Sequence, residues 1–177
     1  PVATVSNRWE RWFLERADLV LAPSRQTATE LRDRLRAEVP VKAHPNGVDT
    51  TRFKAEDATA FRKKYDLPEG PLIGYTGRHG HEKNLEAIFE AVASLEVTVL
   101  FGGKGPATPS LEAAAERHDV KTRFLGFLER EELPEFYNAL DVFAFPSPVE
   151  TQGIVALEAI ACGTPVVGVN AGALAET

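Results

Sequence analysis

The 177-residue sequence contains a single cysteine, Cys162, and no methionine. One cysteine excludes an internal disulfide and is typical of chains that fold in a reducing compartment, so we expect a cytoplasmic protein. The chain begins at Pro1 without an initiator methionine, and it shows no secretory signal pattern. We therefore interpret the sequence as a piece of a longer chain.

Long hydrophobic runs and an excess of positive charge are also missing. No apolar run approaches the roughly 18 residues that suggest a membrane span. The formal net charge of −6 argues against a nucleic-acid-binding surface, because such surfaces concentrate positive charge. A small anionic ligand stays compatible with this charge, since a few well-placed cations suffice to bind it.

Two familiar nucleotide-binding patterns are absent as well. The glycine-rich stretch 102–106 resembles a phosphate-binding loop, but it lacks the G-x-x-x-x-G-K-[ST] spacing. The G-x-G-x-x-G pattern of dinucleotide enzymes does not follow the first strand of the alternating region. A dinucleotide-binding oxidoreductase domain is therefore the weaker of the nucleotide-binding alternatives.

The alternation of strands and helices from residue 55 onward predicts the fold class. The expected strands are 72–75, 97–101, 122–125, 142–145 and 165–169, and the expected helices are 55–65, one that opens at Asn84, 110–117, 131–139 and 153–161. Strands separated by helices indicate a Rossmann-like parallel α/β sheet with helices on both faces. In such sheets ligands bind beyond the carboxyl ends of the strands, so the loops after the strands are where we look for chemistry.

The first 53 residues have a different pattern. We expect a strand at 18–22, a helix capped by Ser24 that runs through Arg36, and an extended piece at 41–44. Pro45-Asn46-Gly47 predicts a turn before the polar stretch 48–53.

An aromatic helix precedes this region. Trp9, Trp12 and Phe13 stand at helical spacing among arginines. Either these rings pack between two domains, or the helix lies on a membrane surface.

Cations and glycines follow the first strand of the alternating region. Gly77 lets the backbone approach a ligand, while Arg78 and Lys83 can converge on an anion. His79 and His81 lack a third clear ligand, and we expect solvated or hydrogen-bonded histidines and no metal site.

Two carboxylates flank the start of the helix at 153–161. Glu150 lies in the preceding loop, and Glu158 stands among apolar helix residues, where a buried acid needs a partner. The free N–H groups at the helix start favour a phosphate-bearing ligand. The alternative is structural, with Glu150 as a cap and Glu158 exposed. Gly163 fits the residue that ends the helix, and Cys162 fits a small packing residue.

These motifs together resemble glycosyltransferase family 4, whose members are retaining, nucleotide-sugar-dependent enzymes with the GT-B fold. The resemblance rests on the E-x7-E arrangement in Glu-Thr-Gln-Gly-Ile-Val-Ala-Leu-Glu from position 150, on a diphosphate-binding element at 77–84, on an inter-domain segment at 46–53 and on a nucleobase-side loop at 124–127. It implies that residues 1–53 are the end of an N-terminal acceptor domain with the inter-domain segment. Residues 54–177 would then be a donor-binding Rossmann-like domain, truncated at its C-terminus.

The resemblance also implies a role for each matched residue. Arg78 and Lys83 would neutralise the donor diphosphate, and Glu150 would hold the transferred sugar, so these are the expected catalytic residues. Glu158 would accept hydrogen bonds from the ribose. The other expected donor-binding residues are Gly77, Phe127, Leu128, Thr151, Gln152, Gly153 and Ile154.

The partners follow from the same resemblance. Because no D-x-D motif appears, we expect no metal or other cofactor, with Arg and Lys replacing a divalent cation. The favoured donor would be a UDP-sugar, with a GDP-sugar as the alternative, and the transferred group would be a hexose. The Glu-Thr-Gln-Gly variant is similar to that of enzymes that glucosylate lipids, so the acceptor would be a lipid or a glycan, reached peripherally at the inner face of a membrane. We expect the fragment alone to be inactive; a catalytically silent nucleotide-sugar-binding module is the other alternative.

Overall fold

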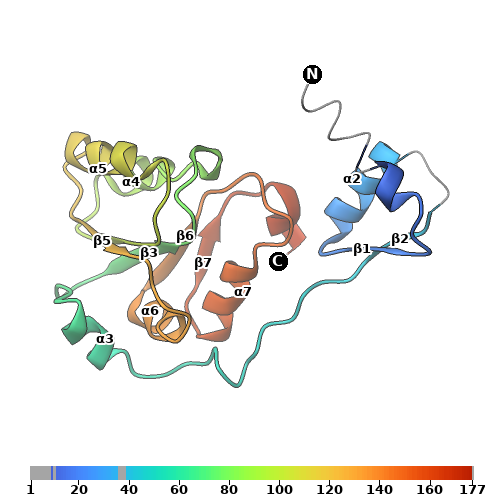
Figure 1. Cartoon of the computed structure of the whole chain (residues 1–177). Coiled ribbons are helices and arrows are strands. Elements are labelled where there is room, and N and C mark those ends of the chain that lie inside the picture. The colour runs from blue at the N-terminus through green and yellow to red at the C-terminus, as the bar shows by residue number, and fades with distance from the viewer. Residues whose placement is uncertain (1–8, 10, 36–38, 177) are drawn as a thin grey trace.

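The computed structural model describes residues 9, 11–35 and 39–176. Figure 1 shows a small unit, which contains β1 (Val20–Ala22), α2 (Arg25–Leu35) and β2 (Val41–Ala43), joined by a long extended stretch to a larger unit. β1 and β2 are parallel. The predicted cap of α2 is confirmed, because the Ser24 hydroxyl accepts a hydrogen bond of 3.1 Å from the backbone N–H of Thr27.

The larger unit is a five-stranded sheet with strand order β5-β4-β3-β6-β7. Its strands are β3 (Leu72–Thr76), β4 (Thr98–Gly102), β5 (Thr122–Gly126), β6 (Val142–Phe145) and β7 (Val166–Gly168). Its helices are α3 (Thr59–Lys64), α4 (Ala87–Val92), α5 (Thr108–Arg117), α6 (Leu133–Ala139) and α7 (Ile154–Ala161), with 3-10 turns η1 (His81–Lys83) and η2 (Gly172–Glu176). All neighbouring strands are parallel, so the predicted fold class is confirmed.

The strand order places a topological switch point beside β3. The chain leaves β3 for β4 on one side and later returns to β6 on the other. At such a point the loops on either side of the central strand diverge and open a crevice at the carboxyl edge. In Figure 1, α4 and α5 cover one face of the sheet, and α3, α6 and α7 cover the other.

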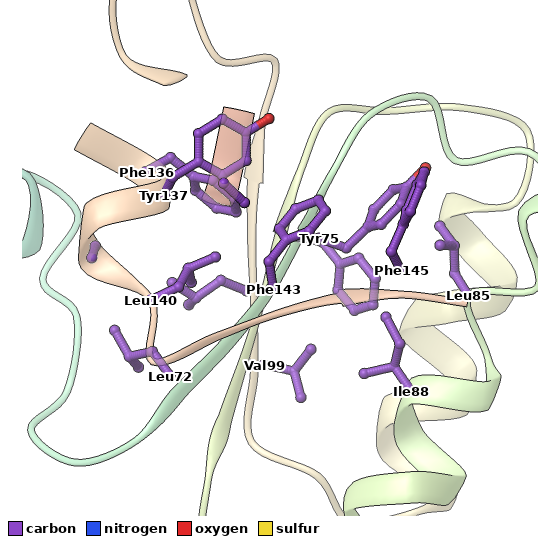
Figure 2. Packing of buried hydrophobic residues seen from close by; sticks show 14 of the residues in the cluster. Leu72, Tyr75, Leu85, Ile88, Val99, Phe136, Tyr137, Leu140, Phe143 and Phe145 are labelled. Carbon is purple, nitrogen blue, oxygen red and sulfur yellow. The ribbon is translucent and has the colours of Figure 1, made fainter. Parts of the chain in front are cut away.

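The core of this unit is rich in aromatic rings. The ring of Tyr75 stacks on Phe143 at 6.3 Å with an interplanar angle of 13°, and it lies 6.4 Å from the ring of Phe145 (Figure 2). β4 is buried along its whole length, because helices cover it on both sides. The continuous apolar pattern of that strand is therefore the one expected for the centre of a parallel sheet.

Some local expectations are corrected. The helix predicted from Asn84 begins at Ala87, because Asn84 has a φ of +53° and follows the 3-10 turn. Pro45–Gly47 forms no turn; the chain turns later instead, where the N–H groups of Arg52 and Phe53 donate to Asp49 O. The role of Gly163 is confirmed by its φ of +82° directly after α7.

The aromatic helix does not pack between the two units. Trp9, Trp12 and Phe13 are 66%, 50% and 70% exposed. The contact between the units is made elsewhere, because the Glu176 carboxylate accepts hydrogen bonds from the backbone N–H groups of Arg25 and Gln26 at the start of α2. Within the described residues, no helix has the length and apolar character needed to cross a membrane.

Candidate functional site

The loops at the carboxyl edge of the sheet approach one another so closely that glycine is required. Gly103 has a φ of +101°, and a Cβ atom there would lie 2.0 Å from the carbonyl oxygen of Gly77. The N–H of Gly103 donates to Gly126 O, which ties the loop after β4 to the end of β5. These loops therefore form one continuous backbone surface.

A cavity of about 380 Å³ opens beside this surface. Its lining comes from the ends of β3, β4 and β5 and from the helices α6 and α7: Thr76, Gly77, Arg78, Gly103, Lys104, Phe127, Leu128, Arg130, Leu133, Tyr137 and Val155. The sequence predicted four of these as ligand contacts, namely Gly77, Arg78, Phe127 and Leu128. Lys104 and Arg130 add two positive charges that were not predicted as contacts.

The structure brings Lys83 and Glu150 together as an ion pair. Lys83 Nζ donates to Glu150 Oε1 at 2.7 Å, and the two side chains are only 20% and 15% exposed. This contact joins η1 to the loop before α7 across 67 positions of the chain. The predicted phosphate-binding cation and the predicted sugar-binding carboxylate therefore neutralise each other in this structure.

Arg78 has a carboxylate partner as well. Its guanidinium donates to Glu82 one helical turn later, on the exposed side of the loop. The pKa of the Glu82 carboxyl lies below its usual value, because a backbone hydrogen bond and the nearby charges of Arg78 and Lys83 favour the ionised form. An exposed pair of this kind contributes little to folding stability, so its guanidinium can exchange partners at low cost.

Glu158 lies half-buried on α7 and is not exposed as the structural alternative required. The hydroxyl of Tyr137 on α6 donates to Glu158 Oε2 at 2.8 Å. Burial raises the pKa of Glu158, while the hydrogen bond from Tyr137 and the charges of Arg52 and Arg130 act in the opposite direction. Burial beside this carboxylate also raises the pKa of Tyr137.

The loop between the two glutamates contacts the inter-domain segment. Gln152 is buried, and three hydrogen bonds of 2.8 to 3.0 Å join its side-chain amide to Asn46. The carbonyl of Thr151 accepts from the Thr27 hydroxyl at 3.2 Å. Contact of Gln152 and Thr151 with a donor stays a prediction; in this structure they hold the first 53 residues against the loop.

The start of α7 is shaped for close approach. Gly153 precedes the helix with a φ of +78°, and Ile154 is the first helical residue. The first N–H groups of a helix have no partner within it, and the helix dipole makes this end positive. The positive N-terminal end of α7 therefore lies directly after the loop that contains Glu150.

His79 has a structural role that the sequence did not reveal. The side chain is fully buried; its Nδ1 lies 2.9 Å from Thr108 Oγ1 and its Nε2 lies 3.3 Å from Gly102 O. Because a carbonyl only accepts, Nε2 carries the proton and Nδ1 accepts from Thr108. Thr108 Oγ1 in turn accepts from the N–H of Gly105 at 3.0 Å. The expectation of a hydrogen-bonded histidine is confirmed here, and burial lowers the pKa of His79.

These features can be compared with known families. Residues 57–177 match the family described as "Glycosyl transferases group 1", and residues 1–52 match "Glycosyltransferase Family 4". The chain belongs to the group 1 glycosyltransferases. The first of these matches covers the sheet, the cavity and both glutamates, and the second covers the small unit.

Curated relatives of this glycosyltransferase chain are transferases of several kinds. The chain is 38% identical to a 2-deoxystreptamine glucosyltransferase of Streptomyces kanamyceticus over 95% of its length and 46% of that protein. It is 34% identical to a D-inositol 3-phosphate glycosyltransferase of Salinispora tropica, over 93% of its length and 39% of that protein. The chain thus spans less than half of each of these relatives.

Solved structures show the same fold. Anabaena Alr3699/HepE in complex with UDP and glucose matches with a TM-score of 0.88 and 27% identity, over 97% of this chain and 50% of that one. A sucrose-phosphate synthase from Thermosynechococcus elongatus matches with a TM-score of 0.85 and 29% identity, over 97% and 45%. The α/β fold is that of the GT-B glycosyltransferases.

Proposed function

We propose that this chain is the donor-binding half of a retaining glycosyltransferase that takes a hexose from a nucleoside diphosphate sugar, with UDP as the favoured nucleotide. The observation that carries the proposal is a set of four side chains from the loops at the carboxyl edge of the sheet and from α7: Arg78, Lys83, Glu150 and Glu158. Lys83 and Glu150 contact each other directly, and Arg78 lines the cavity. Of the four, two suit a diphosphate and two suit hydroxyl groups. The complexes of Anabaena Alr3699/HepE with UDP and UDP-glucose support this choice of donor.

The cations would bind the diphosphate without a metal. Arg78 lines the cavity, and Lys83, in the 3-10 turn η1 that follows, contacts Glu150 in the loop before α7. Both now pair with carboxylates, and a diphosphate would replace Glu82 and Glu150 as their partner. Charge-assisted hydrogen bonds to phosphate are stronger than neutral ones, and phosphate accepts them as well as a carboxylate does.

The nucleoside would occupy the cavity. Phe127 and Leu128 lie in its wall, and the Phe127 ring is 74% exposed, so that its face is available to a flat base. Glu158 would accept hydrogen bonds from the ribose. Glu150, once released from Lys83, would bind the hydroxyls of the sugar, together with the amides near Gly153 and Ile154.

Transfer would follow from stabilisation of the leaving group. As the bond between the anomeric carbon and the diphosphate breaks, its electron pair moves to the phosphate oxygen, and Arg78 and Lys83 stabilise the growing charge. The acceptor hydroxyl forms the new bond on the same face of the sugar and gives its proton to that phosphate oxygen. The anomeric configuration is thereby retained, with no cofactor.

The acceptor and the cellular location are part of the same proposal. We infer a lipid or glycan acceptor and a cytoplasmic protein that contacts the inner face of a membrane. The exposed rings of Trp9, Trp12 and Phe13 support such a contact, because they stand beside Arg11 and Arg16. The Arg16 guanidinium covers the Trp12 ring at 4.1 Å.

Calorimetric titration of the full 177-residue chain tests the donor assignment. The ligands are UDP, GDP, ADP, their glucose and mannose conjugates and NADH, all without added metal. We expect saturable binding of UDP and UDP-glucose, and we expect Glu158→Ala to abolish it. Glu112→Ala, at an exposed position on α5 outside the cavity, serves as the control and should bind as the parent does. Preferential binding of NADH, or no nucleotide binding by a folded chain, overturns the proposal.

A further inference from the structure

The hydrogen bond between Tyr137 and Glu158 joins two helices at the wall of the cavity. Tyr137 belongs to α6 and lines the cavity, and Val155, one helical turn before Glu158 on α7, lines it as well. The hydroxyl of Tyr137 donates to Glu158 Oε2 at 2.8 Å. Within the described residues, Tyr137 is the donor whose hydrogen bond fixes this carboxylate.

Tyr137 cannot easily move its hydroxyl. The ring is fully buried and lies 6.1 Å, 5.9 Å and 5.4 Å from the rings of Phe53, Phe136 and Phe143. Its backbone carbonyl accepts a hydrogen bond of 2.7 Å from the hydroxyl of Thr164. Figure 2 shows the ring beside Phe136, with the hydroxyl directed away from Phe143 and out of the cluster. The donor atom therefore has a fixed position.

The remaining acceptor capacity of Glu158 is suited to a diol. An ionised carboxylate has two oxygens with about four lone-pair sites and no proton to donate. Tyr137 uses a site on Oε2, which leaves Oε1 for a ligand. Because rotation of the carboxylate would break the bond to a rigid tyrosine, the free oxygen is held in a set direction. Two adjacent hydroxyl groups that donate to one carboxylate need such a fixed acceptor.

We propose that Tyr137 is a positioning residue, which holds Glu158 as a fixed acceptor for the ribose hydroxyls and so makes the site select ribonucleotides over deoxyribonucleotides. This inference rests on the proposed donor function and extends it to a residue on α6. Tyr137 itself makes no contact with the reacting atoms. Its effect is transmitted through the orientation and the ionisation of Glu158.

The electrostatics support the geometry. Burial raises the pKa of Glu158 and therefore favours a protonated carboxyl, which would lose acceptor sites. The Tyr137 hydrogen bond lowers the pKa again, as do the charges of Arg52 and Arg130, which face this group from the inter-domain segment and from the loop before α6. Loss of the hydroxyl should raise the pKa, so that UDP binding fails at a higher pH as the solution is acidified.

The chain provides a matched control. Tyr65, just after α3, donates its hydroxyl to Glu132 Oε1 at 2.7 Å, in the same chemical arrangement. Neither residue lines the cavity. Tyr65→Phe and Tyr137→Phe thus delete the same kind of hydrogen bond, one outside the site and one at its wall.

The test is titration of the full chain, Tyr137→Phe and Tyr65→Phe with UDP, 2′-deoxy-UDP and 3′-deoxy-UDP at several pH values. We expect the parent chain to prefer UDP over at least one deoxy analogue by about tenfold, the value of one hydrogen bond to a charged group. Tyr137→Phe should bind UDP about tenfold more weakly while its affinity for that analogue stays nearly unchanged. Tyr65→Phe should keep the preference of the parent.

Three results would decide against the inference. Two of them concern Tyr137→Phe: the variant keeps the preference of the parent, or it loses affinity equally for all three ligands, which indicates a structural role alone. If Tyr137→Phe does not fold, Glu158→Asp applies the same test without a change in the core. This variant keeps the charge but withdraws the carboxylate from Tyr137. The third contrary result is an undiminished preference for UDP in Glu158→Asp. If the parent chain binds no nucleoside diphosphate at all, the proposed function itself fails.

Discussion

The two edges of the parallel sheet differ in charge and in loop structure. At the amino edge a hollow of about 780 Å³ is lined by four carboxylates, Glu96, Glu112, Glu116 and Asp119, with Lys121 beside them. At the carboxyl edge the cavity is about half as large, yet its lining contains Arg78, Lys104 and Arg130 and no carboxylate. In a chain with a net charge of −6, this separation directs an anionic ligand to the smaller cavity.

The comparison also shows that size does not identify the site. The cations Arg78 and Lys104 at the carboxyl edge lie next to Gly77 and Gly103, where two glycine-rich loops bring their backbones close together. The larger hollow is bordered by the turns that lead into β4 and β5, and its acidic lining repels phosphate. Charge and backbone approach together therefore distinguish the edge at which we propose that the nucleotide binds.

Among the changes that distinguish the two edges, loss of the Arg78 guanidinium should reduce the affinity of the carboxyl edge for an anionic ligand the most. We expect Arg78→Ala to weaken UDP binding roughly tenfold to a hundredfold, because each charge-assisted hydrogen bond contributes about 1.5–3 kcal/mol. Calorimetry at low and moderate salt measures the effect. Arg117 on α5, which pairs with Glu86 at 3.3 Å and does not line the cavity, is the matched control. Equal losses in Arg78→Ala and Arg117→Ala would refute the assignment of the cationic edge.

A smaller effect should separate the phosphate-binding from the sugar-binding function. Glu150→Gln removes the charge that now neutralises Lys83. We expect about tenfold weaker binding of UDP-glucose, since a hydrogen bond to a charged group is lost, while UDP binds as well as before or better. Paired titrations with the two ligands give the ratio. Glu56→Gln, which breaks the exposed pair with Lys54, is the control. Equal changes for both ligands would contradict the proposed division of roles.

The smallest effect concerns the pH dependence of folding at the carboxyl edge. Burial lowers the pKa of His79 below its usual value of 6.5, so the unfolded chain takes up a proton that the folded chain resists. This contribution to stability is complete above pH 6.5 and is lost as the pH falls toward the lowered pKa.

Thermal unfolding between pH 7.5 and 5 measures this contribution. His79→Asn should show a shallower fall of the unfolding midpoint than the parent chain, whatever its stability at neutral pH. His81→Gln, at an exposed position in the same loop, should keep the slope of the parent. An unchanged slope in His79→Asn would show that the buried imidazole does not contribute to the pH dependence of folding.

Much of the fold was predictable because it depends on local pattern. The alternation of strands and helices, the cap at Ser24 and the end of α7 at Gly163 follow from nearest neighbours along the chain. The turn predicted at Pro45–Gly47 failed because its residues are held from a distance, by Gln152 across 106 positions. The strand order is likewise absent from the local pattern.

The residues that we propose for the site could be named from the sequence, while their pairing could not. Arg78, Lys83, Glu150 and Glu158 stand in motifs that mark them. Nothing in the sequence shows that Lys83 contacts Glu150, because that pair forms only when two loops meet at the edge of the sheet. Tyr137 looks like an ordinary core position of an amphipathic helix, since a hydroxyl directed at a carboxylate leaves no periodic signal.

The crossing of Gly77 and Gly103 has a consequence for how this chain tolerates variation. At Gly103 the backbone angle and a carbonyl oxygen 2.0 Å from the absent Cβ exclude every other residue, so a library of substitutions should return glycine alone. Gly47 has nothing within 4 Å and a φ open to other residues, and it should accept many replacements. Among the glycines, Gly103 thus has the closest backbone neighbour while Gly47 stands in open space, and only Gly103 lies where the loops after β3 and β4 touch.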